Sequence, residues 1–179
     1  ELKNWLKEVG EKPFRADQIR NRLFCGQVKS FDAMETIPAA LREKLSANFR
    51  ITSLEEAKRL LSEDGTVKWL YRTHDGYHIE TVLIPTNDRF SVCVSTQIGC
   101  AQNCAFCRTA KMGFIRNLEA GEILEEIIRV NWYLEETGSK HNDGSIAKVT
   151  NIIFMGMGEP LNNLEQVHRV CCTLHHQKL

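Results

Sequence analysis

The sequence predicts an α/β fold in which a small helical and β-hairpin region precedes the first βα units of a barrel. Three observations lead to this prediction: helical spacing of apolar residues near the N-terminus, short β-rich runs in the middle, and alternating strand-like and helix-like segments beyond residue 88. Such alternation is typical of a parallel sheet with crossover connections. Because two parallel strands cannot bury both their faces, we expect the natural protein to continue beyond Leu179.

Composition limits the class of protein. The chain has 179 residues, 42% of them apolar, and a formal net charge of zero. This is enough apolar material for one ordinary domain or two small ones. No segment approaches the length of an apolar membrane span and the N-terminus has no apolar signal region, so we expect a cytoplasmic protein without a membrane partner.

Residues 1–50 predict a helical accessory module. Leu2 and Leu6 follow helical spacing, and Pro38 suits the first turn of a helix that ends near Asn48. Proline fits a first turn because the N–H that it lacks would have no helical partner there.

Residues 51–88 predict a β-meander followed by a linker. The runs TVKWLYR and YHIETVLI are rich in β-branched and aromatic residues. The pairs Asp64-Gly65 and Asp75-Gly76 are favoured in tight hairpin turns, since glycine adopts positive φ without strain. Proline and polar residues at 85–88 interrupt the pattern, and we place the linker there.

Residues 89–179 predict two βα units. The strand-like runs SVCVS and VTNIIFM are each followed by a loop and an amphipathic helix, the first from Ala120 to about Glu136 and the second starting near Leu164. In such sheets the ligand site lies in the loops beyond the carboxyl ends of the strands. The cysteine-rich residues 100–107 and the glycine-rich residues 156–160 both fall in these loops. Cys171 continues the apolar stripe of the second helix, and we expect it in the core.

Four of the seven cysteines lie in the stretch CVSTQIGCAQNCAFC, residues 93–107. Cys100, Cys104 and Cys107 form a CxxxCxxC pattern in a loop. A structural zinc site needs four ligands, whereas three thiolates can hold a 4Fe-4S cluster and leave its fourth iron open to a small molecule. The spacing favours a cluster. Zinc remains open if Cys93 or a distant residue completes the site, and purely structural cysteines are the third interpretation.

Basic residues surround the cysteine motif. Between residues 88 and 119 every charged side chain is basic. A solvated face explains such charges as readily as an RNA-binding surface does, so charge alone does not decide between them. The four residues are Arg89, Arg108, Lys111 and Arg116.

The cysteine motif, with an aromatic residue before its third cysteine, resembles the signature of radical S-adenosylmethionine (SAM) enzymes. The stretch GMGEP at 156–160 resembles the motif with which these enzymes hold the methionine end of SAM. Glycines let the backbone approach a ligand closely, and we expect free N–H and C=O groups there to bind the ammonium and carboxylate of SAM. The resemblance implies a partial TIM-type barrel, a 4Fe-4S cluster on Cys100, Cys104 and Cys107, and SAM beside Phe106, Gly156, Gly158 and Glu159.

Further stretches narrow the resemblance. GEKPFRADQI, DGTVKW, IETVLIP, TAKMGFIRNL and NIIFMGMGEPLNN occur in the order found in the RlmN/Cfr family of rRNA adenine methyltransferases, and the RlmN branch is the more similar. The family implies methylation of carbon 2 of an adenine in 23S rRNA, and in tRNA, through an S-methylated cysteine. It also implies an electron donor such as flavodoxin and an N-terminal domain that helps to engage RNA.

The resemblance implies catalytic roles for two more residues. Glu80 matches the proton acceptor, and Cys93 matches the thiol that resolves the protein–RNA adduct. Without the resemblance, Glu80 would be interpreted as a solvent-facing strand residue and Cys93 as a buried strand cysteine. The cysteine that becomes methylated is expected beyond Leu179, and Arg108 stands where a small residue is common in the family.

Two other functions remain open from the sequence. The Cfr branch methylates carbon 8 of the same adenine, and the residues that separate the branches can lie beyond Leu179. The other is a metal-stapled RNA-binding module without catalysis, in which the metal would be fully ligated by the protein and would not bind SAM.

Overall fold

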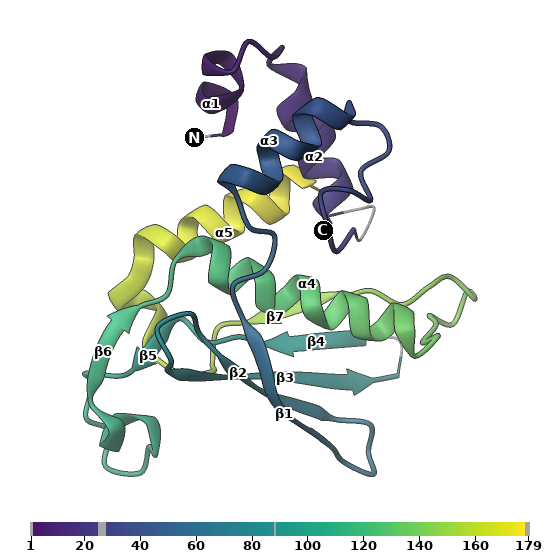
Figure 1. Ribbon diagram of the computed structural model, residues 1–179. Helices are drawn as coiled ribbons and strands as arrows, with labels where there is room; N and C mark the ends of the chain where they lie inside the picture. The colour runs from purple at the N-terminus through teal and green to yellow at the C-terminus, as the bar shows by residue number, and fades with distance from the viewer. Residues whose placement is uncertain (1, 25–27, 88, 178–179) are drawn as a thin grey trace. The chain divides into compact units, whose positions relative to one another are not determined.

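The computed structural model describes residues 2–24, 28–87 and 89–177. The chain divides into two compact units, residues 1–52 and residues 53–179 (Figure 1). Each unit has its own core of buried apolar side chains.

Within the described residues, the first unit consists of the helices α1 (Leu2–Glu8), α2 (Phe14–Phe24) and α3 (Ala39–Asn48). The third helix begins after Pro38 and ends at Asn48, as the sequence predicts. Each fully buried apolar side chain stabilises the fold by about 1.5–3 kcal/mol. The side chains at most 1% exposed include Leu6, Ile19, Met34, Leu41 and Leu45.

In the second unit the described strands form a five-stranded sheet with the order β1-β2-β3-β4-β7. The first four strands are antiparallel neighbours, whereas β4 and β7 are parallel, with Cys93 opposite Ile153. The linker predicted at residues 85–88 is wrong for Pro85 and Thr86, which belong to β3 and pair with β4 in the same sheet, and residue 88 lies outside the described residues. The strands are β1 (Glu55–Leu61), β2 (Val67–Arg72), β3 (His78–Thr86), β4 (Arg89–Cys93) and β7 (Asn151–Ile153).

Both predicted Asp-Gly turns are confirmed. Gly65 lies between β1 and β2 with φ of 83°, and Gly76 lies between β2 and β3 with φ of 86°. Positive φ of this size strains residues with a Cβ, so glycine is the residue these turns require.

A second, two-stranded sheet pairs β5 (Gln97–Gly99) with β6 (Phe114–Asn117) in antiparallel orientation. Between these strands runs the cysteine loop, residues 100–113, which includes the short 3₁₀ helix η1 (Thr109–Met112). A further 3₁₀ helix, η2 (Pro160–Asn163), leads into the last helix.

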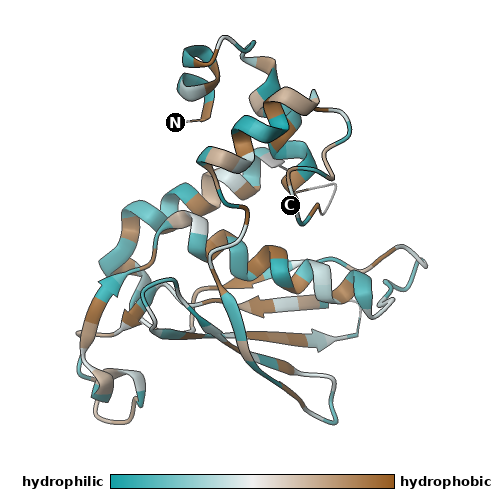
Figure 2. Cartoon of the chain, viewed as in Figure 1, coloured by the Kyte–Doolittle hydropathy of each residue, from teal (hydrophilic) through white to brown (hydrophobic). Residues whose placement is uncertain are grey.

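The helices α4 (Ala120–Glu136) and α5 (Leu164–Gln177) confirm the two predicted amphipathic segments. α4 lies along the sheet in Figure 1, and hydrophobic residues (brown in Figure 2) run along β3 and β4. Alternate strand residues such as Trp69, Leu83 and Val92 share one buried cluster with Ile123 and Ile127 of α4. The predicted α/β class with parallel strands is confirmed, and none of the described helices is long and apolar enough to cross a lipid bilayer.

Cys171 corrects one expectation, because it is exposed. The buried stripe of α5 instead runs through Val167, Val170 and Leu174. Each helical residue turns the side-chain direction by about 100°, so Cys171 points away from the side that Val170 buries.

Candidate active site

Two loops meet at the carboxyl ends of the parallel strands β4 and β7. Beyond β4 the chain passes through residues 94–96 into β5 and the cysteine loop. Beyond β7 it forms the glycine loop, residues 154–159, which leads into η2 (Figure 1). Both motifs therefore lie at the edge of the sheet where α/β proteins place their ligand sites.

Hydrogen bonds fasten the glycine loop to the segment that follows β4. The Gly156 N–H donates to the Val94 carbonyl at 3.0 Å, and the Met157 carbonyl accepts from the Thr96 N–H at 2.8 Å. The Met157 N–H donates to the Ser95 hydroxyl at 3.0 Å. These bonds continue the parallel pairing past the ends of the strands, so the protein itself holds the glycine loop in place.

The glycines of this loop are required by close contact within the protein. A Cβ at Gly156 would lie 2.6 Å from the Val94 carbonyl oxygen. A Cβ at Gly158, where φ is 101°, would lie 2.6 Å from the Cβ of Gln97. The N–H groups of Gly156 and Glu159 are bonded within the protein, so a ligand has to use other groups of this loop.

The three cysteines of the motif differ in exposure. Cys100 is buried, and its N–H donates to the Gly113 carbonyl at 3.1 Å. Cys104 is exposed and Cys107 is half-buried. Hydrogen bonding from the Ala110 backbone lowers the pKa of the Cys107 thiol, which favours the thiolate form that binds metals.

These thiols fit an iron–sulfur cluster in donor type and in backbone support. Thiolates are the ligands of 4Fe-4S clusters, and N–H groups bonded to their sulfur atoms tune the cluster. Over the described part of the chain, no three His, Cys, Asp or Glu side chains already surround a metal position. Because metal binding commonly completes the folding of its own loop, we expect a cluster to draw the three thiols together.

Large apolar side chains are exposed on the loops at this end of the sheet. Phe106 of the cysteine loop is 93% exposed, Met155 of the glycine loop 80% and Leu161 of η2 73%. Exposed apolar groups of this size commonly mark contact with a ligand or a partner.

Glu80 and Cys93 lie on the same face of the sheet. Cys93 is opposite Val82, and Glu80 precedes Val82 by two residues on the same strand, so all three share a face. The Glu80 carboxylate pairs with the Lys68 ammonium at 2.7 Å, and its backbone carbonyl accepts from the Ser95 hydroxyl at 2.7 Å. Burial raises the pKa of the half-buried Cys93 thiol, which favours its protonated form.

Sequence reasoning missed Glu126, a fully buried residue of α4. Its carboxylate accepts hydrogen bonds from the Thr81 hydroxyl and, at 3.1 Å, from the Ser95 N–H. Its second oxygen is buried without a partner among the described residues, and burial raises its pKa well above the ordinary 4.5. The available signal was its position, three residues after Ile123 and one before Ile127, inside the apolar stripe.

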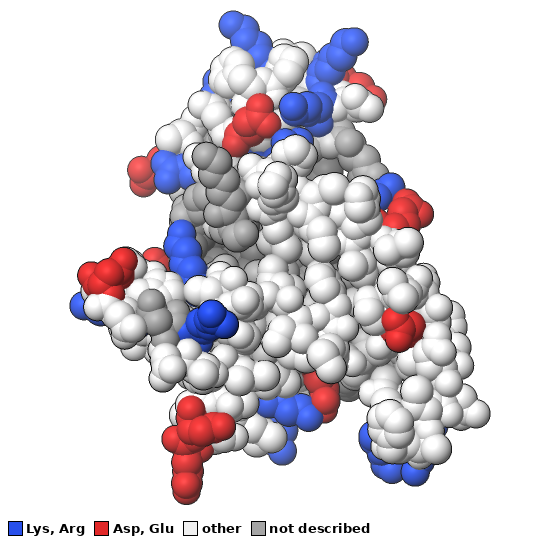
Figure 3. All heavy atoms as spheres, turned by 180° about the vertical axis from the view of Figure 1, so that it is seen from behind, with Lys and Arg blue, Asp and Glu red and all other residues white. Residues whose placement is uncertain are grey.

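One of the four basic residues around the cysteine motif is already engaged. Arg116 bonds to Asp75 and to Glu122, each at 2.7 Å, and these carboxylates raise its pKa. It is therefore not available to an RNA phosphate. On the face seen in Figure 3, basic (blue) and acidic (red) side chains both occur and neither sign dominates.

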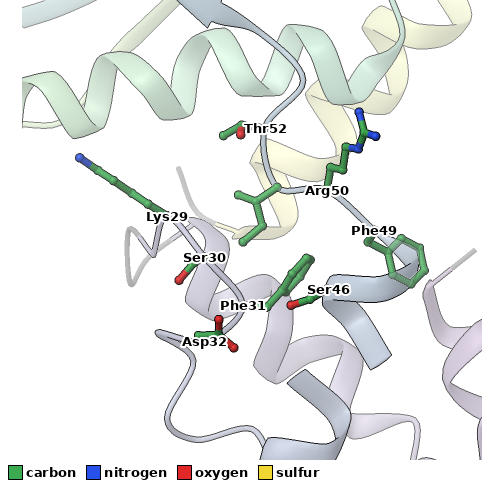
Figure 4. A pocket seen from close by; sticks show the side chains of 9 residues that line it. Lys29, Ser30, Phe31, Asp32, Ser46, Phe49, Arg50 and Thr52 are labelled. Atoms are coloured by element: carbon green, nitrogen blue, oxygen red, sulfur yellow. The ribbon is translucent and has the colours of Figure 1, made fainter. Parts of the chain in front are cut away.

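The first unit has a pocket of about 270 Å³ of its own. In Figure 4 the Lys29 and Arg50 side chains extend outward from it. It mixes apolar groups with charges of both signs and brings together none of the predicted site residues. Its lining consists of Lys29, Ser30, Phe31, Asp32, Ser46, Phe49, Arg50, Ile51 and Thr52.

Comparison with known proteins connects both units to one family. Residues 1–51 match the family model of the ribosomal RNA large subunit methyltransferase (RlmN) N-terminal domain. The chain is 47% identical over 167 residues to a probable dual-specificity RNA methyltransferase RlmN of Bacillus pumilus, covering 93% of this chain and 44% of that protein. It is 46% identical over 162 residues to the RlmN of Anaeromyxobacter dehalogenans, covering 90% and 43%.

Comparison of the fold with solved structures agrees with the sequence similarity. A crystal structure of a radical SAM methyltransferase from Sphaerobacter thermophilus superposes with a TM-score of 0.88 at 40% identity, over 98% of this chain and 49% of that one. The chain spans about half the length of the curated relatives it matches. Over nearly its whole length the chain is therefore similar to about half of the RNA methyltransferases named RlmN and of a radical SAM methyltransferase, and its first 51 residues match the RlmN N-terminal domain.

Proposed function

We propose that the full-length protein methylates carbon 2 of an adenine in 23S rRNA, and in tRNA, through an S-methylated cysteine. The observation that carries this proposal is the hydrogen-bonded junction between the glycine loop and the segment that leads to the cysteine loop. The junction joins a three-thiol motif to a SAM-type motif at the ends of two parallel strands. The name of the relatives, dual-specificity RNA methyltransferase, supports two kinds of RNA substrate.

The cofactors would be held by the loops described above. A 4Fe-4S cluster and SAM supply one-electron chemistry at a methyl group, which an adenine ring carbon needs because it does not attack a sulfonium methyl directly. The chain contributes placement, electrostatics and exclusion of water. The cluster ligands would be Cys100, Cys104 and Cys107, and the SAM contacts would come from Phe106, Gly156, Gly158 and Glu159.

Glu80 and Cys93 would act on the RNA side of the reaction. Glu80 would accept the proton from the adenine carbon, and its ion pair with Lys68 orients the carboxylate on the half-exposed sheet face. Cys93 would release the product from the protein–RNA adduct. Its raised pKa means that the thiol keeps its proton at neutral pH until a base removes it.

The remaining partners follow from the reaction. A one-electron step needs a reductant, for which we propose a donor such as flavodoxin. The helices α1, α2 and α3 would help to engage RNA, in agreement with the family model that covers residues 1–51. Such an enzyme would act in the cytoplasm, where its RNA substrates are.

Anaerobic reconstitution of the full-length protein with iron and sulfide tests the cofactor part. We expect a 4Fe-4S electron paramagnetic resonance signal that changes when SAM is added. A protein that takes up only zinc, or a cluster that ignores SAM, would instead favour a metal-stapled RNA-binding module.

Mass spectrometry of the methylated RNA tests the product. We expect 2-methyladenosine in 23S rRNA fragments and in tRNA, and 8-methyladenosine would assign the enzyme to the Cfr type. Cys93→Ala should accumulate a covalent protein–RNA species, whereas Cys172→Ala, which removes an exposed cysteine on α5, should turn over like the wild type. Full turnover by Cys93→Ala would reject the role given to that thiol.

A further inference from the structure

Asn163 closes the base of the cysteine loop. It is the last residue of η2, the short helix that directly follows the glycine loop, and it is 4% exposed. Its side-chain nitrogen donates to the Thr96 carbonyl and to the Leu118 carbonyl, each at 2.8 Å. Thr96 precedes β5 and Leu118 follows β6, so one amide joins both ends of the segment that contains the cysteines.

Gln97 makes a second link between the same two loops. Its side-chain oxygen accepts from the Glu159 N–H at 2.8 Å, and its side-chain nitrogen donates to the Asn117 side-chain oxygen at 2.8 Å. Gln97 is 1% exposed. Because the partner at Glu159 is a backbone N–H, only the amide oxygen can face it, and this fixes the orientation of the Gln97 amide.

The chemistry of these partners requires an amide at Asn163. The carbonyls of Thr96 and Leu118 can only accept hydrogen bonds, so one side chain satisfies both only if it has two hydrogens to donate. A carboxylate of the same shape would place oxygen against both carbonyl oxygens and remove both bonds, although the Thr96 carbonyl would still accept from the Leu118 N–H at 3.0 Å. The site is therefore selective for asparagine over its closest isostere.

We propose that Asn163 and Gln97 are positioning residues that form an amide clamp between the cysteine loop and the glycine loop, and that this clamp sets how tightly SAM binds to the assembled cluster. The inference rests on the proposed function, because it requires that the two loops hold the cluster and SAM. A loosened clamp lets the cysteine loop shift against the glycine loop, although the backbone bonds of Gly156 and Met157 remain, and the thiols can still bind iron. SAM affinity therefore falls by about tenfold or more, the effect of losing buried hydrogen bonds at a binding site.

Asn163→Asp in the reconstituted full-length protein tests the clamp. The measurements are iron and sulfide per protein, and the SAM concentration that gives half of the spectral change of the reduced cluster. We expect wild-type cluster content and a SAM concentration raised about tenfold or more. The matched control is Asn162→Asp, which makes the same chemical change at the exposed neighbouring residue and should bind SAM like the wild type.

Thermal unfolding shows whether Asn163→Asp folds. If it does not, two substitutions at Gln97 test whether the amide clamp sets SAM affinity. Gln97→Glu keeps an oxygen for the Glu159 N–H, and the Asn117 amide can turn to donate to the new carboxylate if it gives up its 3.4 Å bond to the Asn162 carbonyl. Gln97→Leu has neither group. We expect Gln97→Leu to weaken SAM binding about tenfold and Gln97→Glu to restore it to within about threefold of the wild type.

Three results would overturn the clamp. The first is wild-type SAM binding by Gln97→Leu and by any folded Asn163→Asp protein. The second is a loss of iron in these variants with unchanged SAM binding by the remaining cluster, since this confines the amides to the fold of the cysteine loop. The third is a wild-type cluster that ignores SAM, which rejects the proposed function itself and the clamp with it.

Discussion

The glycine loop and the cysteine loop lie at the same end of the sheet but are held in different ways. The glycine loop is bonded through Gly156, Met157 and Glu159 to residues that follow β4. The cysteine loop is fastened mainly at its base, and its middle exposes Cys104 and Phe106. One half of the site is thus shaped by the protein's own contacts, whereas the other half offers thiols that a cluster would have to gather.

This difference predicts opposite responses to mutation. Substitutions in the glycine loop should destabilise the protein in the absence of any cofactor. Substitution of the exposed Cys104 in the cysteine loop should leave the stability of the apoprotein unchanged and abolish cofactor binding.

The largest effect is expected for Gly156→Ala. The new Cβ would lie 2.6 Å from the Val94 carbonyl oxygen, a backbone atom that cannot move without breaking the parallel pairing beyond β4. We expect the free energy of unfolding to fall by about 3 kcal/mol, measured by urea denaturation of the apoprotein.

Gly121→Ala is the matched control, because a Cβ at Gly121 of α4 would meet nothing within 4 Å. Alanine is also the better helix former, so the control should be neutral or stabilising by up to about 1 kcal/mol. Equal stability of Gly156→Ala and the wild type would contradict the view that internal contacts shape the glycine loop.

A smaller effect is expected for Arg116→Met at the base of the cysteine loop. Arg116 on β6 ties this base to Asp75 of the β2–β3 turn and to the buried Glu122 of α4. Removing the guanidinium leaves the buried Glu122 carboxylate without its arginine, although it keeps the Glu119 N–H at 2.9 Å and the His74 ring at 4.0 Å. We expect a loss of about 2 kcal/mol, below the value for a fully buried pair because Arg116 is partly exposed.

Urea denaturation at low and high salt measures this loss. Arg108→Met is the control, since Arg108 lies exposed in the middle of the same loop, and it should change the free energy of unfolding by less than about 0.5 kcal/mol. A similar loss in both variants would mean that general charge, and not the anchored ion pair, accounts for the effect.

The pH dependence of stability should report on Glu126, which supports Ser95 below the glycine loop. Burial and the neighbouring Glu122 and Glu125 raise its pKa, so above about pH 4.5 the folded state holds a proton that the unfolded state has released. Stability should therefore fall as the pH rises through the folded-state pKa, by at most about 1.4 kcal/mol per pH unit.

Glu126→Gln removes this titration, so its stability relative to the wild type should increase with pH over the same window. Denaturation curves between about pH 5 and pH 8 measure the difference. Glu135→Gln, at an exposed position of the same helix, should follow the wild-type curve. Parallel curves for Glu126→Gln and the wild type would show that Glu126 does not titrate there.

Local pattern accounts for much of the fold. The periodicity that predicts helices from Ala120 to Glu136 and from Leu164 is confirmed, because burial against a sheet imposes an apolar stripe on each helix. The run VTNIIFM predicts a longer strand than β7, which covers only Asn151–Ile153. Its apolar residues continue into the glycine loop, where contact with the segment after β4 replaces strand pairing.

The buried polar side chains that hold the two loops in place had no local sequence pattern from which they could be predicted. Asn163 bonds to Thr96 across 67 residues, and Glu126 bonds to Thr81 across 45, so neither pattern repeats along the chain. The prediction that Cys171 is buried was wrong although it used the local pattern, because a shift of one position along a helix separates a buried residue from an exposed one. Local periodicity reports burial within an element, whereas hydrogen bonds between distant loops depend on the assembled fold.

The smallest expected effect on stability, and the sharpest contrast with Gly156→Ala, belongs to Cys104→Ser. Cys104 is exposed, so the free energy of unfolding of the apoprotein should change by less than about 0.5 kcal/mol. After reconstitution the same variant should hold no more than background iron, because two remaining thiols cannot hold the cluster. Cys172→Ser, at an exposed cysteine of α5, should bind iron like the wild type. If Cys104→Ser kept its iron, Cys104 would not be a ligand; if it unfolded without any cofactor, the cysteine loop would be as firmly shaped by the protein as the glycine loop is.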